Sequence, residues 1–322
     1  MNRIYLLISL SFVLLFGCSP KNKWLLQSDT NLGDLHDVEV IGDQLAYAYG
    51  YGTGSVFKTT NGAQSWQKIA QFDSLYFEHI QFVNPEVGWI AGEDGHIYKT
   101  TDGGVNWTDQ RIEIDTSMGM LLLYALYFYN ENEGVTGGIS FKRKPRKVSI
   151  QYFRTTDGGE NWTAEEAPSM LYKLTQVADG TLWASASGAI FTQASVGADW
   201  VNRTASVEES LRDIRSFDQN EQTIIAAEFG GGHLLISRDG GDNWQRKKLS
   251  NNVFRSIRYL GKNRWIVVGS TNKEKGHVFL SEDNGNTWQA LEQDWPDVHR
   301  LGLSRRYVWL VGKEGFVARM KR

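Results

Sequence analysis

Cysteine, proline and histidine are scarce in this chain, and charge of neither sign is in excess. The 322 residues include one cysteine, five prolines and six histidines, with a formal net charge of -3. One cysteine excludes a disulfide framework within the chain, and the slightly acidic balance argues against nucleic acid as a partner. The sequence shows no metal-ligand cluster and no phosphate loop before a predicted helix. No metal and no cofactor are therefore expected.

A long apolar run occurs only at the N-terminus. Arg3 is followed by an apolar stretch from Ile4 to Phe16, which is short for a membrane span and typical of a signal peptide. The next residues complete the string LFGC at 15–18, which resembles the lipobox of bacterial lipoproteins. That resemblance implies cleavage before Cys18 and acylation of its thiol.

The lipobox predicts three segments: a signal peptide at 1–17, a lipidated cysteine with a short tether at 18–22, and a folded domain at 23–322. Acyl chains on Cys18 anchor a protein to a membrane, so a cell-envelope lipoprotein is expected. Ser19 after the cysteine favours, by the same resemblance, the outer membrane, facing the periplasm or the cell surface. The alternative is a plain secretory signal.

Glycine and tryptophan are abundant, with 33 and 12 copies, because they belong to a repeat. An eight-residue string recurs at intervals of roughly forty residues, a period typical of propellers and solenoids. A degraded copy, QASVGADW, ends at Trp200. The other copies are TTNGAQSW (59–66), TTDGGVNW (100–107), TTDGGENW (155–162), SRDGGDNW (237–244) and SEDNGNTW (281–288).

Each period predicts four short strands separated by turn signals. One unit reads FEHIQFV (77–83), VGWIAG (87–92), GHIYKTT (95–101) and NWTDQRI (106–112). This grammar is that of one propeller blade.

The two ends of the chain supply complementary pieces of a last blade. Three strands are predicted between Val298 and Met320 without a fourth, whereas KWLLQ (23–27) precedes the first blade and places Trp24 where a repeat tryptophan belongs. Pairing these ends would leave no long sheet edge exposed. The prediction is an all-β, seven-bladed β-propeller of four-stranded blades, closed by pairing the N-terminal strand with the last blade.

The repeat, (S/T)-x-D-x-G-x-(T/N/S)-W, resembles the Asp-box or BNR repeat of β-propellers. The longer string GWIAGEDGHIYKTTDGGVNW (88–107) most closely resembles propellers of the photosystem II assembly and stability factor type. The resemblance covers nearly all of the mature chain and implies a non-catalytic assembly role. Sialidases and xyloglucanases share the box, so it specifies the fold better than the function.

We expect the box to be structural. Its aspartate can accept hydrogen bonds from backbone N–H groups of its own turn, its glycines adopt positive φ, and its tryptophan packs between blades. The predicted structural residues are Asp102, Asp157, Asp239, Asp283, Trp66, Trp107, Trp162, Trp244 and Trp288.

Binding residues are expected on the face that the boxes do not occupy. One candidate is the insertion at 139–150, whose cations attract an anionic partner or surface; the alternative is a solvated hairpin. A second is the pair of strings LRDIRSF and FRSIRYL, which are expected to align Arg212 with Arg255 and Arg215 with Arg258, beside His299 and Arg300. The cations of the insertion are Lys142, Arg143, Lys144, Arg146 and Lys147.

Like charges on inner strands are costly unless they are compensated. Either an anionic ligand, such as an acidic peptide, or an internal ion-pair ring with Asp37, Glu39, Glu78 and Asp213 can compensate them. Aromatic residues form a third candidate set for an interface, although they are also ordinary strand residues. These are Tyr47, Tyr49, Tyr51, Tyr124, Tyr127, Tyr172 and Trp295.

Two functions follow from these features. The first is a monomeric, lipid-anchored scaffold that binds a protein partner and has no catalytic residue. The alternative is a sialidase-like or xyloglucanase-like glycosidase, in which arginines would hold a sugar carboxylate beside a tyrosine. Against it, the Phe-Arg-Ile-Pro signature of sialidases is missing, six blades are usual for them, and xyloglucanases use two propellers.

Overall fold

The computed structural model describes residues 24–72, 76–114, 119–142, 144–271 and 275–322. The expected signal peptide, Cys18 and the tether lie outside these residues. Within them, no helix is long and apolar enough to cross a membrane.

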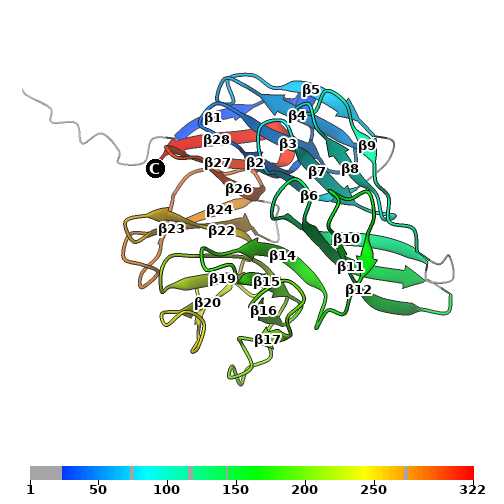
Figure 1. Ribbon diagram of the computed structural model, residues 1–322. Helices are drawn as coiled ribbons and strands as arrows, with labels where there is room; N and C mark the ends of the chain where they lie inside the picture. The colour runs from blue at the N-terminus through cyan, green and yellow to red at the C-terminus, as the bar shows by residue number, and fades with distance from the viewer. Residues whose placement is uncertain (1–23, 73–75, 115–118, 143, 272–274) are drawn as a thin grey trace, which may run out of the picture.

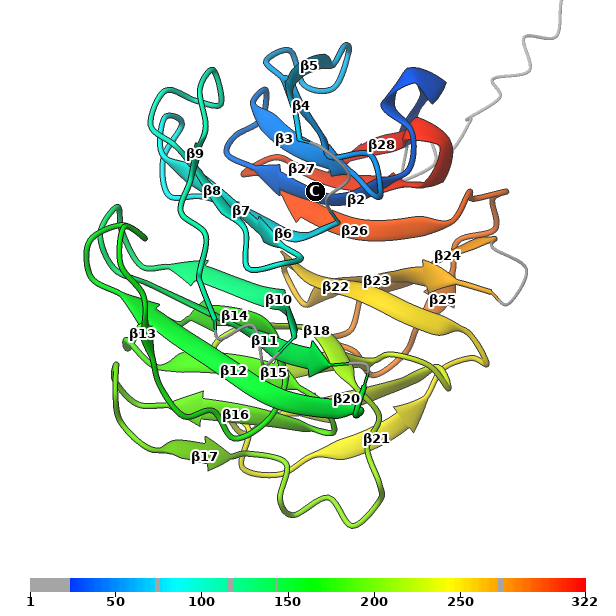
Figure 2. The same ribbon diagram turned by 90° about the vertical axis from the view of Figure 1, so that its right-hand side faces the viewer.

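The strands form seven sheets of four strands each, which confirms the predicted seven-bladed propeller. The sheets follow one another around the molecule in chain order until the last, in red, meets the first, in blue (Figures 1 and 2). Adjacent strands within each sheet are antiparallel. The inner strands are β2 (Leu35–Val40), β6 (Phe77–Phe82), β10 (Met120–Phe128), β14 (Leu171–Gln176), β18 (Ile214–Gln219), β22 (Val253–Gly261) and β26 (Val298–Leu303).

The second strands are almost entirely buried because apolar blades cover both of their faces. They are β3 (Ala46–Gly50), β7 (Gly88–Gly92), β11 (Gly134–Lys142), β15 (Leu182–Ala186), β19 (Ile224–Glu228), β23 (Arg264–Ser270) and β27 (Tyr307–Gly312).

The third and outer strands complete each blade. The third strands are β4 (Ser55–Thr59), β8 (Ile97–Thr100), β12 (Lys147–Thr155), β16 (Ala189–Gln193), β20 (His233–Ser237), β24 (Gly276–Ser281) and β28 (Phe316–Lys321). The outer strands are β5 (Gln67–Gln71), β9 (Thr108–Asp109), β13 (Thr163–Ala164), β17 (Trp200–Asn202), β21 (Gln245–Lys248), β25 (Gln289–Ala290) and β1 (Trp24–Ser28). Two short 3-10 helices, at Thr30–Leu32 and Lys313–Gly315, flank the closure.

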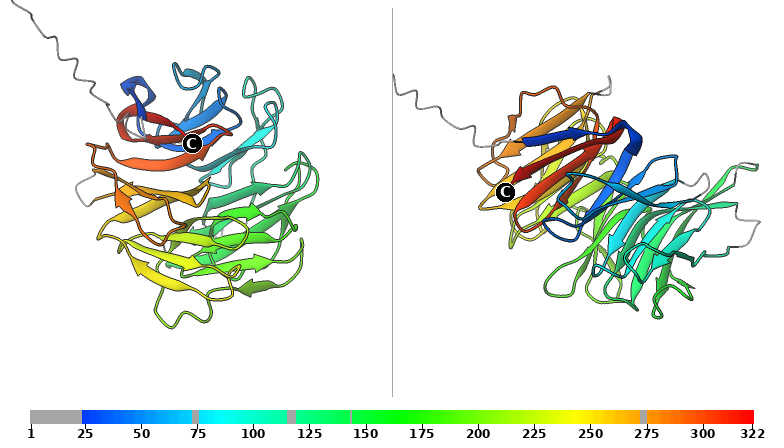
Figure 3. Two further views of the ribbon diagram at one scale, coloured as in Figure 1. Left: turned by 90° about the vertical axis from the view of Figure 1, so that its left-hand side faces the viewer. Right: turned by 90° about the horizontal axis from the view of Figure 1, so that it is seen from above.

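The ring closes between the two ends of the chain. Strand β1 pairs antiparallel with β28, with Trp24 opposite Met320 and Ser28 opposite Phe316. The last sheet therefore has the order β1-β28-β27-β26, and Figure 3 shows its blue and red strands side by side. This confirms the predicted closure, which pairs the edge that β28 would otherwise expose.

Seven apolar clusters lie between neighbouring blades and form the core. Each cluster contains one tryptophan of the repeat or its N-terminal counterpart, and this large side chain contacts both blades. Following the order of the clusters around the ring, these are Trp24, Trp66, Trp107, Trp162, Trp200, Trp244 and Trp288.

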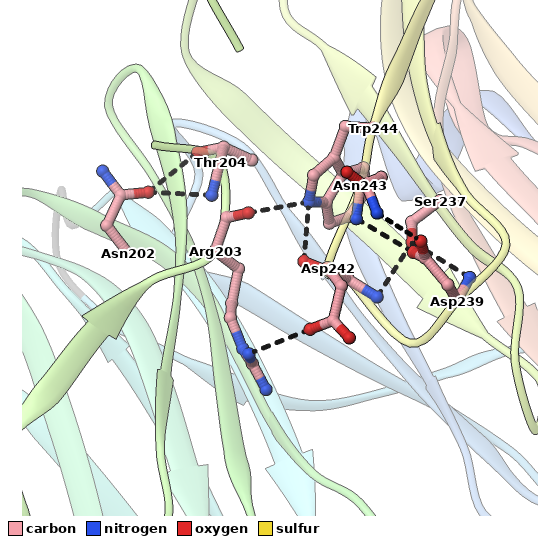
Figure 4. Close-up of polar contacts among 9 residues, drawn as sticks. Asn202, Arg203, Thr204, Ser237, Asp239, Asp242, Asn243 and Trp244 are labelled. Atoms are coloured by element: carbon pink, nitrogen blue, oxygen red, sulfur yellow. Dashed lines mark hydrogen bonds and ion pairs between the residues drawn. The ribbon is translucent and has the colours of Figure 1, made fainter. Parts of the chain in front are cut away.

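The box of blade five, shown in Figure 4, illustrates how the repeat builds its turn. Ser237 donates a 2.8 Å hydrogen bond to the carboxylate of Asp239, which also accepts a 2.9 Å bond from the backbone N–H of Asn243. The indole of Trp244 donates to the carbonyl oxygen of Arg203 in blade four at 2.8 Å. The box is thus both a local turn and a tie between neighbouring blades.

The same carboxylate contacts recur in the boxes of Asp102, Asp157 and Asp283. Hydrogen bonds from the backbone and side chain of the asparagine four residues later stabilise the charged form, so the pKa values of Asp102 and Asp157 fall to about 2. These acids are engaged within their own turns.

Candidate functional site at the channel mouth

Every inner strand carries a β-bulge, at the second or third residue in six blades and at the fifth of nine residues in β10. The pairing with the second strand skips one residue in each of the seven blades. A bulge turns one side chain out of the regular alternation and is common beside functional sites. The seven bulged residues, one from each blade in order, are His36, Glu78, Tyr124, Tyr172, Arg215, Arg255 and His299.

These bulges bring residues from distant parts of the chain together at one end of the channel. Five bulged residues line a single cleft together with Phe229 and Arg300. The two tyrosines continue the ring, since Tyr172 lies under the guanidinium of Arg215 at 4.3 Å and contacts Tyr124 with ring centroids 5.9 Å apart. We call the bulged residues, with Phe229 and Arg300, the channel mouth.

Three arginines at the mouth face carboxylates at distances too long for good hydrogen bonds. The closest nitrogen–oxygen distances are 3.5 Å from Arg300 to Asp37 and 3.7 Å from Arg255 to Asp297. Arg215 lies 3.8 Å from Asp213. A guanidinium has five N–H donors, so these loose ion pairs leave donors available to a ligand.

Asp213 is already engaged by uncharged groups. Its two oxygens accept hydrogen bonds of 2.7 Å each, from the hydroxyls of Tyr172 and Ser187. The Nε atom of Arg215 is buried and has no hydrogen-bond partner among the described residues. Arg215 is therefore the least satisfied cation of the mouth.

Burial sets the protonation of the remaining groups. It is the main cause that lowers the pKa of His36 to about 3, so this imidazole is neutral at physiological pH. It also raises the pKa of Glu78 and lowers that of Arg255. Burial opposes the ionisation of Asp37, but the hydrogen bond from His79 and the charge of Arg300 outweigh it and bring its pKa to about 2.

The expected alignment of the blade-five and blade-six arginines is wrong by three residues. Arg215 and Arg255 are the equivalent residues, because each is the bulge of its strand. The serines that follow them act alike: Ser216 accepts a hydrogen bond from the N–H of Ile257, and Ser256 from that of Leu301. The spacing Arg-x-x-Arg fits either register, and only pairing with the second strand distinguishes them.

The other two arginines of those strings lie elsewhere. Arg212 precedes β18 and is exposed. Its guanidinium lies beside Gly230, 3.6 Å from the position that a Cβ atom would occupy there. Arg258 lies further down the inner strand, where it donates to its neighbour's carbonyl oxygen at 2.9 Å. His299 and Arg300 do lie at the mouth, where His299 also contacts Asp297 at 3.4 Å.

A second charged layer lies below the mouth. Burial is the main cause that raises the pKa of Glu39 to about 7 and lowers that of Lys173 to about 7. The ammonium of Lys173 donates to the carbonyl oxygen of Phe217 at 2.8 Å. The charges of Arg258 and Lys173 favour the ionised form of Glu39, but burial outweighs them. The internal ion-pair ring stays a prediction.

The basic insertion forms the turn between β11 and β12. Lys142 pairs with Lys147 across the hairpin, while Lys144, Arg146 and Lys147 are exposed. Arg143 lies outside the described residues. The insertion and the channel mouth share one face, because the end of β11 pairs with the start of β10, and the start of the inner strands is the end nearer to six of the seven bulges.

The aromatic set is divided by the structure. Tyr47, Tyr49 and Trp295 are buried at 0%, 0% and 3% exposure, which makes them core residues. Tyr124 and Tyr172 lie at the mouth, and Tyr51 is exposed and stacks on His36 with centroids 4.8 Å apart. Tyr127 is partly buried in the core between blades three and four.

Sequence reasoning did not identify His36, Phe229 or Asp297 as part of this site. A search for the second residue of each inner strand would have found His36, but the bulge that gives this position its meaning is not visible in the sequence. Among the described residues, no group of three or more His, Cys, Asp or Glu side chains is arranged to hold a metal ion.

The profile of the Photosynthesis system II assembly factor YCF48 family matches residues 64–227, half of the chain. The chain belongs to this family. A YCF48 relative, Photosystem II assembly lipoprotein Ycf48 of Synechococcus sp. (strain CC9902), is 22% identical over 216 residues, or 65% of this chain. The match spans 61% of that relative's length, and 54% of the corresponding Nostoc lipoprotein.

Solved structures of YCF48 and of a protein with a different activity share the fold. YCF48 bound to D1 peptide superposes with a TM-score of 0.72 at 20% identity, covering 93% of this chain and 97% of that one. A streptogramin B lyase superposes with a TM-score of 0.70 at 10% identity, covering 93% and 98%. At these identities the likeness shows the fold alone.

Proposed function

We propose that this protein is a non-catalytic scaffold that binds an acidic segment of a protein partner at the channel mouth. The observation that carries the proposal is the loose engagement of Arg215, Arg255 and Arg300, whose carboxylates lie 3.5 to 3.8 Å away. A carboxylate of the partner can accept hydrogen bonds from these guanidiniums in geometries that the internal acids do not reach. The aromatic rings beside them add apolar contact area.

Membership of the YCF48 family supports a binding role. One solved member is described as bound to D1 peptide, and curated relatives are named assembly proteins. For this chain the partner is an envelope protein with an acidic segment, and no photosynthetic role follows from the fold.

Lipidation of Cys18 would place the scaffold on a membrane. The lipobox at 15–18 supports this anchor, as do the relatives named lipoproteins. We propose that the protein is a monomer anchored to the outer membrane, with the propeller facing the periplasm or the cell surface.

The glycosidase alternative finds little support at the mouth. Burial and the hydrogen bond to Asp213 both raise the pKa of Tyr172, which disfavours the phenolate that a tyrosine nucleophile would use. Purified protein should release no product from a sialoside or a β-glucan. Turnover that depends on Tyr172 would overturn the non-catalytic proposal.

A pull-down tests the binding site. The lipidated protein carrying Arg215→Glu and Arg255→Glu should recover at least about tenfold less partner than the unchanged protein. Lys262→Glu with Arg305→Glu changes the net charge equally on the opposite face, at two exposed residues, and should recover the partner normally. Equal recovery of the partner by the protein with Arg215→Glu and Arg255→Glu would contradict the proposed arginine site.

A further inference from the structure

Blade three projects beyond the other blades as a long hairpin. Its strands β10, β11 and β12 have nine residues each, whereas most inner and second strands have five or six. The hairpin tip lies at the opposite end of the molecule from the C-terminus in Figure 1 and in the right-hand view of Figure 3. Three features of this hairpin have no partner among the described residues: an apolar face, an open strand edge and exposed cations.

The first feature is an apolar sheet face. Residues directly opposite one another in paired strands share a face, and the register builds two apolar rows across the hairpin. The outermost residues are exposed: Met120 by 44%, Val148 by 51% and Ile150 by 46%. The rows are Met120, Phe141 and Val148, then Leu122, Ile139 and Ile150.

On an ordinary surface strand the polar face is exposed and the apolar face is buried, and these rows show the reverse. Ser140, on the other face of β11, is 1% exposed, whereas the apolar side chains face solvent. Contiguous exposed apolar side chains of this kind mark interaction sites in soluble proteins.

The second feature is an open strand edge. The outer strand β13 pairs with β12 only at Phe153 and Arg154, and one further bond joins the N–H of Glu165 to the carbonyl oxygen of Tyr152. No other described strand pairs with the outer edge of β12. Because backbone groups alternate along a strand, those of Val148 and Ile150 point outward like those of Tyr152.

The third feature is the uncompensated charge at the tip. Lys144, Arg146 and Lys147 are exposed, and none lies within 4.0 Å of a carboxylate of the described residues. Lys142 stands directly opposite Lys147, an arrangement of like charges that costs stability. Lysines on an edge also discourage self-pairing, but Val148 to Gln151 carries no such charge.

We propose that the outer edge of β12 binds an extended segment of a protein partner as an added strand. Apolar residues at alternate positions of that segment would extend the two rows beside Val148 and Ile150, and acidic residues at one end would contact the basic tip. A strand satisfies the open backbone edge, the apolar face and the cations together. A lipid surface leaves the open edge unpaired.

This second contact rests on the proposed scaffold role but uses residues separate from the channel mouth. Both surfaces lie on the same face, so one partner can contact the hairpin and the mouth together. Two contacts of moderate strength give a combined affinity well above either one.

The test uses the purified full chain and a labelled peptide in which four valines alternate with threonines and three glutamates follow, measured by fluorescence anisotropy. Val148→Lys and Ile150→Pro should each weaken binding at least about tenfold. Proline at position 150 removes only an outward N–H, so the pairing of β11 with β12 is kept. The same peptide with alternate amides N-methylated should also bind at least about tenfold more weakly.

Val201→Lys is the matched control, because Val201 on the outer strand of blade four is also 51% exposed. It should leave peptide binding unchanged. Val148→Lys should still weaken binding at least about tenfold when Arg215→Glu and Arg255→Glu are also present, since these two changes remove the mouth as a site for the three glutamates and separate the two sites. Equal binding of the N-methylated peptide would overturn strand addition. Binding to anionic vesicles in place of the peptide, or a dimer that Val148→Lys abolishes, would overturn the proposed occupant.

Discussion

Arg246 holds the fully buried carboxylate of Glu228 through two hydrogen bonds, of 2.9 Å from Nε and 2.8 Å from Nη2. The arginine is on the outer strand of blade five and the glutamate ends its second strand. A buried carboxylate is costly to leave without its partner. Loss of Arg246 is therefore expected to destabilise blade five.

Arg246→Met should lower the free energy of unfolding by about 3 to 5 kcal/mol, because it leaves Glu228 buried and uncompensated. Arg246→Met combined with Glu228→Gln should lose less than Arg246→Met alone. Urea denaturation measures both. Lys275→Ala breaks a pair in which both side chains are mostly exposed, Lys275 with Asp294, and should cost less than about 1 kcal/mol.

Closure of the ring should depend on Trp24. Its ring packs edge to face on Trp295 with centroids 5.3 Å apart, in the cluster between blades six and seven. Trp24→Ala should cost about 2 kcal/mol, less than for a fully buried tryptophan because this ring is partly exposed. Leu25→Ala, at a side chain that is 49% exposed, should change the denaturation midpoint little. An equal loss for both variants would contradict this account.

Glu39 should make stability depend on pH between about 4.5 and 7. Its pKa is raised to about 7 in the folded state, so the unfolded chain ionises first and stability falls as the pH rises through this window. Glu39→Gln should remove that decline and raise the free energy of unfolding at pH 8 by about 2 kcal/mol. The equivalent position of the next blade already holds Gln81, so the amide fits the fold.

Urea titrations of the two proteins at pH 4 and pH 8 distinguish the outcomes. Lys173 has the opposite effect above pH 7. Its pKa is lowered to about 7 in the folded state, so between pH 7 and 10.5 the unfolded chain binds more protons and stability increases as the pH rises. A parallel decline in the wild type and the variant between pH 4 and pH 7 would assign the effect to other groups.

The box aspartates should support stability until strongly acid pH. The pKa values of Asp102, Asp157 and Asp239 are lowered to about 2, so their contribution is present above pH 3.8 and is lost as the pH falls toward 2. Replacing all three with asparagine should lower the melting temperature at pH 7 and flatten its fall between pH 4 and pH 2. An unchanged acid slope would show that other carboxylates control acid unfolding.

Much of the architecture could be predicted because it depends on local, repeated chemistry. The box string forms its own turn through contacts within eight residues, as Asp102 and Asn106 show. Its period therefore predicted seven blades, and the unpaired N-terminal strand with Trp24 predicted the closure that β1 and β28 make. These features need no knowledge of distant contacts.

The channel mouth could be predicted only in part, because its members come from seven strands spread over the chain. Sequence reasoning found Arg215, Arg255, His299 and Arg300, but aligned Arg215 with the wrong partner. A bulge is decided by which residue of the neighbouring strand each backbone group meets, and that pairing is a tertiary property.

The sequence by itself determined the repeat, the number of blades and the residues that close the ring, because short-range turn chemistry and apolar spacing specify them. Only the tertiary structure decided which side chains share the mouth, that Trp295 belongs to the core and that the basic insertion carries an open apolar edge. Those outcomes depend on strand register and on what packs above each face, and neither is encoded within a single repeat.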